Sequence, residues 1–369
     1  MSAERWTHTG PTQQVVVGSS AVDVLPDIVR ALGMRRVLVV TTPGRAESEI
    51  AERVISRLGR VHASTSAVVE PMVPAPSVQR GVMELRGSGA DSILALGGGS
   101  AIDTAKALAF FAEQEAGTPA AGFADRPVMP IVAVPTTLVG AAFTGTFSMV
   151  DPHTRRGSMA GGLTTVPVAV LADLDPLSDL SAEALRRSVA AALAQGIDVA
   201  LDPASDPEAR ALAAAGVASL VSGALDPQEG QIPREVLDGS VLAGRSMVTS
   251  PDGLQRALVR LVAGRTGAPF GAVHAALAPH TTRVVGDVVP ESVLAPVASA
   301  VRAQPGQSVA DALERLLVDT LGAVGLSTLG VSDEDLDAAA RQSASQPGVQ
   351  RAARPLGETD VRALLDDAW

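Results

Sequence analysis

The chain has 369 residues, of which 46% are hydrophobic and 19% charged, and its formal net charge is −11. This length favours two domains, while the acidic balance and the short apolar runs argue against nucleic acid and membranes as partners. Cysteine is absent, which excludes disulfides and thiolate metal ligands. The N-terminus lacks the pattern of a secretory signal, so we expect a cytoplasmic protein.

Short apolar segments alternate with helical patterns from about Gln14 to Leu171. Strands are predicted within residues 13–18, 36–42, 60–69, 92–99 and 129–137, and helices within residues 22–32, 46–58, 78–86 and 100–111. Such alternation predicts a mostly parallel sheet with helices on both faces. The unbroken apolar runs RVLVV and PIVAV fit strands that are covered on both sides.

The pattern changes in the second half of the chain. A hairpin is expected around Asp151 to Arg156, followed by a last strand within residues 167–180. From Ser181 onward, segments rich in alanine and leucine show helical periodicity. The sequence therefore predicts an α/β domain over residues 1–178 and an all-helical domain over residues 179–369.

Residues 96–106, LGGGSAIDTAK, form the most distinctive motif. A predicted strand leads into three glycines, and Ser100 is expected to begin a helix, with Asp103 placed for a reciprocal N-terminal cap. Glycines allow close backbone approach, and a helix N-terminus attracts a phosphate. The spacing matches neither the dinucleotide fingerprint G-x-G-x-x-G nor the Walker loop. A glycine turn of this kind can also be purely structural.

GGGSAIDTAKALA followed by PIVAVPTT resembles the iron-containing alcohol dehydrogenase family. The segments TGPTQQVVVG, VVTTPGR and RPLGETDVRALLDDAW are most similar to its maleylacetate reductase branch. The resemblance runs from end to end. It implies the fold shared with dehydroquinate synthase, namely an α/β nucleotide-binding domain and an all-α substrate domain, and it implies a homodimer.

The resemblance also implies a set of cofactor-binding residues. Gly97, Gly98, Gly99 and Ser100 would hold the pyrophosphate of NAD or NADP. Asp103 and Lys106 would lie on the ribose side, and Thr136 and Thr137 near the nicotinamide ribose. A solvated helix lysine is the alternative interpretation of Lys106.

Thr42 stands where many relatives have an aspartate that would bind the adenosine 2′-hydroxyl. Without that carboxylate a 2′-phosphate meets less repulsion, and nearby Arg45 could pair with one. Both NAD and NADP are therefore allowed as cofactor, although Arg45 could also be an ordinary surface residue.

The metal ligands that the family supplies are replaced in this sequence. Their positions correspond to Ala191, Gln195, Arg256 and Phe270, and Arg260 replaces a neighbouring histidine. Alanine and phenylalanine cannot bind a metal, glutamine is a weak ligand, and arginine stays protonated. We therefore predict no catalytic metal.

Four residues are candidates for catalysis: Gln195, Arg256, Arg260 and His274. The two arginines would point into an interdomain cleft and offer positive charge to a carboxylate or an oxyanion. They could instead pair with Asp198 or with the acidic segment DPQEG. His274 and His280 would have pKa values suited to proton transfer, or they could be structural residues.

These residues lead to several hypotheses. The first is a metal-independent NAD(P)-dependent oxidoreductase that acts on a small molecule carrying a carboxylate. A variant is a natural-product enzyme, since family-like dehydrogenases occur in daptide-type biosynthesis and could oxidise a peptide C-terminus. A catalytically silent cofactor-binding subunit is a different class. A lyase similar to dehydroquinate synthase would need the metal ligands that are missing.

Overall fold

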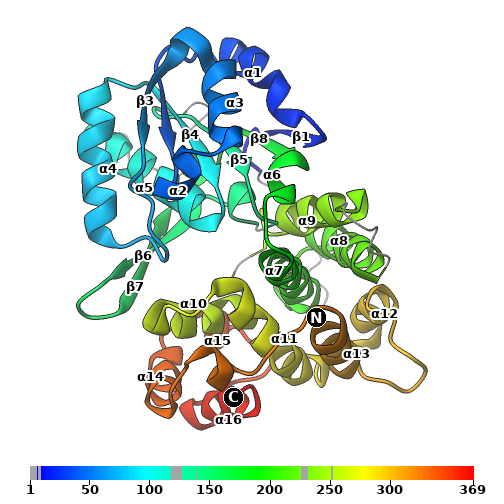
Figure 1. Ribbon diagram of the computed structural model, residues 1–369. Helices are drawn as coiled ribbons and strands as arrows, with labels where there is room; N and C mark the ends of the chain where they lie inside the picture. Colours follow the sequence, from blue (N-terminus) through cyan, green and yellow to red (C-terminus); the bar gives the residue numbers. More distant parts are fainter. Residues whose placement is uncertain (1–5, 7–9, 118–126, 139, 226–231, 251) are drawn as a thin grey trace. The chain divides into compact units, whose positions relative to one another are not determined.

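The computed structural model describes residues 6, 10–117, 127–138, 140–225, 232–250 and 252–369 (Figure 1). The chain divides into two compact units: Pro11–Ser181, and Ala182–Trp369 together with the described residues Trp6 and Gly10. The expected boundary between residues 178 and 179 stays a prediction of domain organisation. The first unit extends past that position because Asp179 forms an ion pair with Arg45 inside it.

A six-stranded parallel sheet forms the centre of the first unit (Figure 1). Its strand order is β1-β8-β5-β4-β2-β3. The strands are β1 (Gln14–Gly18), β2 (Val37–Val40), β3 (His62–Ser66), β4 (Ser92–Gly97), β5 (Ile131–Pro135) and β8 (Ala169–Asp173). All residues of β2, β4, β5 and β8 are buried, as the apolar runs indicated. The expected α/β architecture is confirmed.

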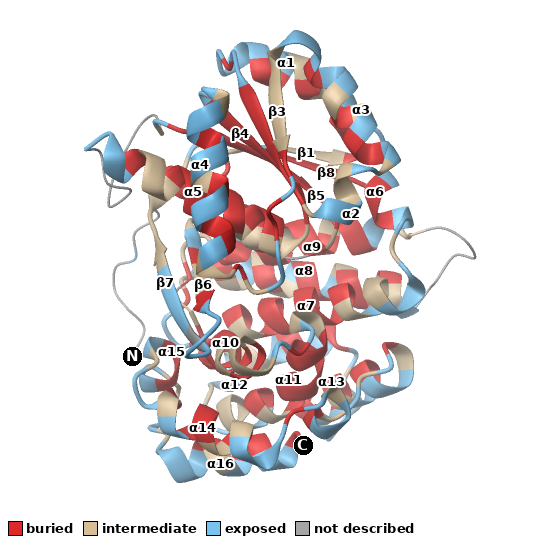
Figure 2. Ribbon diagram, turned by 60° about the vertical axis from the view of Figure 1, so that its left-hand side comes forward, coloured by how far each residue is buried: buried red, intermediate tan, exposed pale blue. Residues whose placement is uncertain are grey.

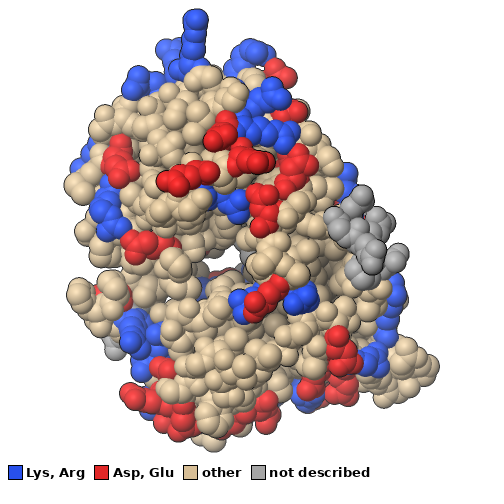
Figure 3. All heavy atoms as spheres, viewed as in Figure 1, with Lys and Arg blue, Asp and Glu red and all other residues tan. Residues whose placement is uncertain are grey.

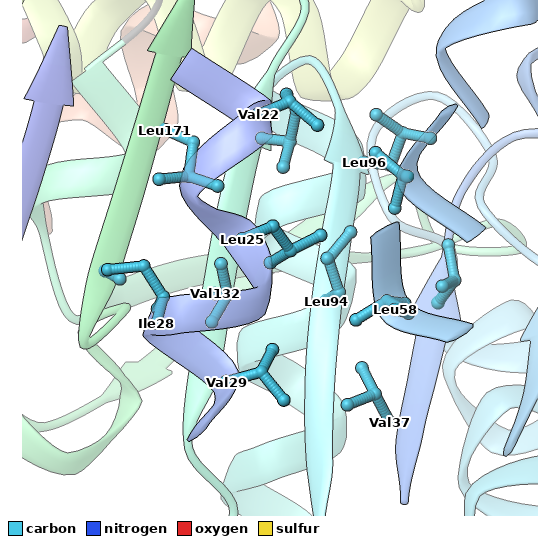
Figure 4. Close-up of a cluster of buried hydrophobic side chains, with 14 of the residues drawn as sticks. Val22, Leu25, Ile28, Val29, Val37, Leu58, Leu94, Leu96, Val132 and Leu171 are labelled. Atoms are coloured by element: carbon cyan, nitrogen blue, oxygen red, sulfur yellow. The ribbon is translucent and has the colours of Figure 1, made fainter. Parts of the chain in front are cut away.

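Helices cover this sheet on both faces. They are α1 (Leu25–Ala31), α2 (Pro43–Ala46), α3 (Glu49–Leu58), α4 (Ala75–Ser88), α5 (Gly99–Glu115) and α6 (Asp175–Ser178). Figure 4 shows apolar side chains of α1 and α3 packed on the alternate residues of the strands that face them, such as Leu94, Leu96 and Leu171. Full burial of each such side chain stabilises the fold by roughly 1.5–3 kcal/mol. α5 packs on β4 and β5.

The expected hairpin is present as β6 (Thr146–Asp151) and β7 (Arg156–Gly161). Asp151 forms its turn by accepting the backbone N–H groups of His153 at 2.8 Å and Thr154 at 3.2 Å. At the other end Gly161 has a φ of +139°, and a Cβ there would lie 2.1 Å from the carbonyl oxygen of Gly145. Glycine is therefore required where the two strands separate.

All regular elements among the described residues of the second unit are helices, as expected. Its helices are α7 (Ala182–Leu201), α8 (Pro207–Leu225), α9 (Arg234–Ser246), α10 (Leu254–Thr266), α11 (Phe270–Gly286), α12 (Glu291–Ala300), α13 (Val309–Arg315), α14 (Asp333–Ser343), α15 (Pro347–Gln350) and α16 (Glu358–Asp367). Helix α7 is buried along most of its length (Figure 2). It packs against α8, α9, α10 and α11.

Helices α8 and α9 cross at two glycines. A Cβ on Gly216 would lie 2.6 Å from the backbone nitrogen of Ala243, and one on Gly239 would lie 2.7 Å from that of Leu220. By length and composition α8 could cross a membrane, and 39% of its apolar window is buried. Because one face of α8 packs closely on α7 and α9, its apolar composition also suits a packed core helix.

Candidate functional site

The glycine turn lies between β4 and α5, at the carboxyl edge of the sheet. Gly97 has a φ of +148°, and a Cβ there would lie 2.8 Å from the Cβ of Ala101. A Cβ on Gly98 would lie 3.0 Å from the Oγ1 atom of Thr137. Any larger residue would crowd this turn, so the glycines keep its backbone open to a ligand.

The helix after the turn begins at Gly99, with Gly98 as its N-cap, and no side chain caps it. The expected cap by Ser100 and Asp103 is wrong, because the helix begins before Ser100 and both residues lie inside it. Asp103 Oδ1 accepts a hydrogen bond from Lys106 Nζ at 3.2 Å. The first N–H groups of an α-helix have no partner within the helix. Together with the helix dipole they favour an anion next to Gly99 and Ser100.

The strands beside the turn fix its position. On one side the N–H of Thr136 donates to the Gly97 carbonyl at 3.1 Å, and on the other Thr41 Oγ1 donates to the Leu96 carbonyl at 2.8 Å. Thr137 Oγ1 is buried and has no hydrogen-bond partner among the residues that the structure describes. An unsatisfied buried hydroxyl costs about 1–3 kcal/mol, and a polar ligand on the turn would relieve this cost. The turn and Thr137 therefore suit the phosphate and ribose groups of a dinucleotide.

Lys106 is fully buried, so the alternative of a solvated helix lysine is wrong. Its Nζ donates to Asp103 Oδ1 at 3.2 Å, to the Thr146 carbonyl at 3.0 Å and to Thr144 Oγ1 at 3.4 Å. Burial lowers the pKa of Lys106, and the charge of Asp103 opposes this shift. Lys106 thereby ties α5 to the start of the hairpin, and its role at the ribose stays a prediction.

Thr42 and Arg45 follow β2, the strand next to β4. Thr42 caps the short helix α2, and its hydroxyl accepts the N–H of Arg45 at 3.2 Å. The sequence analysis missed this helix, which Pro43 and the threonine cap favour. Arg45 Nη1 contacts Asp179 Oδ2 at 3.0 Å, so the guanidinium already has an anionic partner within this unit.

The helical unit contains a second polar cluster, which begins on α7. Ala191, Gln195, Asp198 and Asp202 are spaced at intervals of four, three and four residues, which places them on one face of the helix. Ala191 is fully buried, Gln195 is 6% exposed and Asp202 7% exposed. Polar groups buried to this degree need partners.

Arg256 and Arg260 on α10 supply part of that pairing. Arg256 Nε donates to Asp198 Oδ2 at 2.9 Å, and its Nη1 lies 3.6 Å from Asp252 Oδ1. Arg260 Nη2 contacts Asp252 Oδ2 at 2.8 Å. Pairing with Asp198, one of the two alternatives, is thus confirmed for Arg256. The other candidate partner, DPQEG at residues 226–230, lies outside the described residues.

Asp198 also binds the N-terminus of α10. Its Oδ1 accepts the backbone N–H of Gln255 at 3.1 Å, and Gly253, the N-cap residue, approaches so closely that a Cβ would lie 2.3 Å from this oxygen. Asp198 was expected only as a possible ion-pair partner of the arginines, and Asp252 was not expected in this cluster. Their only signal is an aspartate seven residues after Ala191 and an Asp-Gly pair before a helix.

His274 on α11 is fully buried. Burial, together with the positive charges of Arg256 and Arg260, lowers its pKa to about 3. The pKa of His280 is also lowered, mainly by burial. The expectation of a pKa suited to proton transfer near neutral pH is therefore wrong for His274. For His280 burial likewise disfavours the charged imidazole, and a role in proton transfer stays a prediction.

Hydrogen bonds define the tautomer of His274. Thr281 Oγ1 donates to Gln255 Oε1 at 2.5 Å, which turns the amide nitrogen of Gln255 toward the imidazole. That nitrogen donates to the His274 carbonyl at 3.0 Å and lies 3.4 Å from Nδ1. Nδ1 is thus assigned as an acceptor and Nε2 as the N–H donor. Nε2 has no hydrogen-bond partner among the described residues.

A cavity of about 20 Å³ lies beside this cluster, within the helical unit. Its polar lining includes Asp198, Asp202, Gln255, Thr281 and Arg351. Burial raises the pKa of Asp202, and the charge of Asp198 adds to this shift. A polar cavity of this size holds about one water molecule. It is too small for an organic substrate.

The positions at which the resemblance implies metal ligands carry side chains that are poor donors for iron or zinc, and the loss of a metal site stays a prediction. They present a methyl group at Ala191, an amide at Gln195, a guanidinium at Arg256 and a phenyl ring at Phe270. The ring of Phe270 stacks edge-on against His274, with 4.8 Å between centroids. No group of three or more potential metal-binding side chains was found in the described part of the chain.

An open parallel sheet with a glycine turn at the carboxyl end of a central strand is the architecture of α/β nucleotide-binding proteins. The family model "Iron-containing alcohol dehydrogenase" matches residues 11–174, and the model of the C-terminal part of the Fe-containing alcohol dehydrogenase family matches residues 197–369. The chain belongs to the iron-containing alcohol dehydrogenase family.

The relatives include maleylacetate reductases. That of Rhizobium sp. (strain MTP-10005) is 28% identical over 369 residues, with 99% of this chain and 97% of the relative covered. The crystal structure of maleylacetate reductase from Rhizobium sp. strain MTP-10005 has 26% identity, a TM-score of 0.83 and coverage of 100% and 99%. A putative alcohol dehydrogenase from Ralstonia eutropha JMP134 has 26% identity, a TM-score of 0.86 and coverage of 100% and 98%.

Proposed function

We propose that the protein is a metal-independent, NAD(P)-dependent oxidoreductase that transfers hydride to or from a carbonyl or alcohol of a carboxylate-bearing substrate. The observation that carries the proposal is Arg256, a buried arginine paired with Asp198 where the family's resemblance places a metal ligand. A guanidinium supplies positive charge without coordination chemistry. The family membership supports hydride transfer as the reaction type.

The glycine turn and Thr137 would hold the cofactor. The N–H groups of Gly99 and Ser100 suit its pyrophosphate, and the hydroxyl of Thr137, which has no partner among the described residues, suits a ribose or amide group. When bound, the nicotinamide supplies or accepts the hydride. The protein's contribution on this side is orientation, because the turn accepts hydrogen bonds from Thr136, which follows β5, and from Thr41.

The arginine cluster would bind the acidic part of the substrate. Arg256 and Arg260 face the carboxylates of Asp198 and Asp252, so their charges are balanced within the unit. Arg260 is the more accessible arginine, with 20% of its side chain exposed. One of its five N–H groups contacts Asp252, which leaves donors for a substrate carboxylate.

His274 would act as a neutral hydrogen-bond donor. With a pKa of about 3 its imidazole is uncharged at neutral pH, and the assigned tautomer carries the proton on Nε2. A neutral donor in a dry environment polarises a carbonyl oxygen without transferring its proton. Gln255 and Thr281 hold this tautomer in place. Gln195, buried on the facing helix α7, would position these groups.

The first test combines cofactor binding with metal analysis of one purified sample. We expect NADPH or NADH to bind, as followed by nicotinamide fluorescence, with iron and zinc well below one equivalent. A panel of keto acids, hydroxy acids and peptides with a free C-terminus should then oxidise or reduce the cofactor. Activity that is lost on chelation and restored by iron or zinc would overturn the metal-independent part.

A catalytically silent binding subunit is the second candidate, and one observation favours it. The site's arginines are already paired with aspartates, as expected for a structural cluster. Both candidates predict cofactor binding. Only an oxidoreductase would turn over a carboxylate substrate, and Arg260→Ala would reduce that turnover. Absence of turnover across the panel would favour the silent subunit.

A further inference from the structure

Arg45 lies in α2, the short helix that follows β2 at the carboxyl edge of the sheet, and β2 is the neighbour of β4, which leads into the glycine turn. We propose that Arg45 and Asp179 together select NADP(H) over NAD(H). Asp179 holds the guanidinium when no dinucleotide is bound, and the 2′-phosphate of NADP(H) displaces Asp179 from it. The inference rests on the proposed function, since it concerns the same dinucleotide site.

The register of β2 and β4 places the start of α2 and the glycine turn at the same level of the sheet. β2 and β4 are adjacent and parallel, with Val40 opposite Ala95. Thr42 and Gly97 each follow two residues later, so their backbones are separated by about one strand spacing, roughly 4.8 Å. In open α/β sheets the pyrophosphate lies on the glycine turn and the adenosine ribose is recognised from a neighbouring strand end. α2 therefore begins where the protein would contact the 2′ substituent of the adenosine ribose.

The local chemistry favours a phosphate at this place. Sites that prefer NAD present a carboxylate to the 2′-hydroxyl, and this carboxylate repels a 2′-phosphate. Residues 41–45, TTPGR, contain no carboxylate. The hydroxyl of Thr42 is neutral and accepts the N–H of Arg45, which holds the arginine on the first turn of α2.

A comparison with a second arginine shows why Arg45 is available. Arg53 uses Nε, Nη1 and Nη2 on Asp23 and Asp175. Arg45 contacts Asp179 through Nη1, and the side chain of Asp179 is 51% exposed. Ion pairs this exposed are weak and screened by salt. A 2′-phosphate carries more charge and can accept two N–H groups of one guanidinium, so it outcompetes Asp179.

The test uses the full-length protein and calorimetric titration with NADPH and NADH. The readout is the ratio of the two affinities, which cancels effects common to both dinucleotides. Arg45→Ala should lower the preference for NADPH at least about tenfold. Asp179→Asn should raise it about two- to fivefold, the range for one partly exposed ion pair. Thr42→Asp should shift the preference toward NADH.

Two further measurements separate the causes. 2′,5′-ADP and 5′-AMP, titrated in the same way, should repeat these changes, because they carry the discriminating group without nicotinamide. Arg57→Ala is the matched control: it removes another partly exposed arginine that pairs with Asp23 and should leave the ratio unchanged. The effect of Asp179→Asn should shrink as salt rises from 0.05 to about 0.5 M.

The outcomes distinguish this inference from the proposed function. A wild-type protein that binds neither dinucleotide overturns both. Binding of both dinucleotides, with a ratio unaffected by Arg45→Ala or Asp179→Asn, overturns this inference alone. An equal loss of affinity for both in Arg45→Ala, with an unchanged unfolding midpoint, would also overturn it, because it would assign Arg45 to a part that the two dinucleotides share.

Discussion

The glycine turn and the arginine cluster differ in whether their polar groups have partners. At the turn, within the described part of the chain, the hydroxyl of Thr137 is buried without a partner and the N-terminus of α5 has no side-chain cap. In the cluster, Arg256 and Arg260 are already matched by Asp198 and Asp252. The turn in the α/β unit thus has polar groups that a ligand could satisfy, whereas the arginines of the helical cluster already have anionic partners.

Charge on the surface gives little further guidance. On the face shown in Figure 3, basic and acidic side chains are interspersed, as the many surface ion pairs require. Such pairs contribute about 0–1 kcal/mol each. The informative charges are therefore the buried ones, and the predictions below test whether their pairing is structural, catalytic or both.

The largest expected effect is on stability in the arginine cluster. Arg256→Ala leaves Asp198 buried without its cation and should lower the free energy of unfolding by about 3–5 kcal/mol. Arg256→Met with Asp198→Asn should recover much of this loss. The matched control is Arg187→Ala, which breaks an exposed pair with Glu183 and should cost at most about 1 kcal/mol. Urea denaturation measures all four proteins; equal losses in Arg256→Ala and Arg187→Ala would contradict the buried pairing.

The second effect is a pH dependence that comes from His274. Its folded pKa of about 3 lies below the unfolded value of 6.5, so the unfolded state binds the proton more readily between these values. Stability should therefore be complete above pH 6.5 and fall as the pH decreases toward 3, by about 2 kcal/mol from pH 7 to 5. In His274→Gln, denaturation at pH 7 and pH 5 should give a free energy of unfolding that lacks this decrease. If the variant and the wild type show the same pH dependence, His274 is in contact with solvent.

The third effect concerns the turn. Gly98→Ala places a methyl group 3.0 Å from Thr137 Oγ1 and 3.2 Å from its Cγ2, which should displace the threonine and weaken dinucleotide binding roughly tenfold or more. Gly87→Ala is the control, because a Cβ there meets nothing within 4 Å. Fluorescence titration with NADPH and NADH provides the measurement. Full affinity in Gly98→Ala would mean that the turn is structural only.

The comparison also explains what the sequence could predict. Runs such as residues 36–40 and 130–134 mark buried strands because each short segment carries its own pattern, and the glycine turn is local in the same way. The ion pair of Arg256 with Asp198 joins residues 58 positions apart, so no local pattern reveals it. The burial of Lys106 and the low pKa of His274 likewise arise from packing by other elements.

The smallest effect on stability, and the most direct test of catalysis, is expected at Arg260. Its pair with Asp252 is partly exposed, at 20% and 23% of the side chains, so Arg260→Ala should change the free energy of unfolding by at most about 1 kcal/mol. If Arg260 binds the substrate carboxylate, the KM for an acid should rise while the KM for its uncharged amide stays the same. Equal changes for acid and amide would assign the arginine a structural role, and the helical cluster would then differ from the glycine turn in function as well as in charge balance.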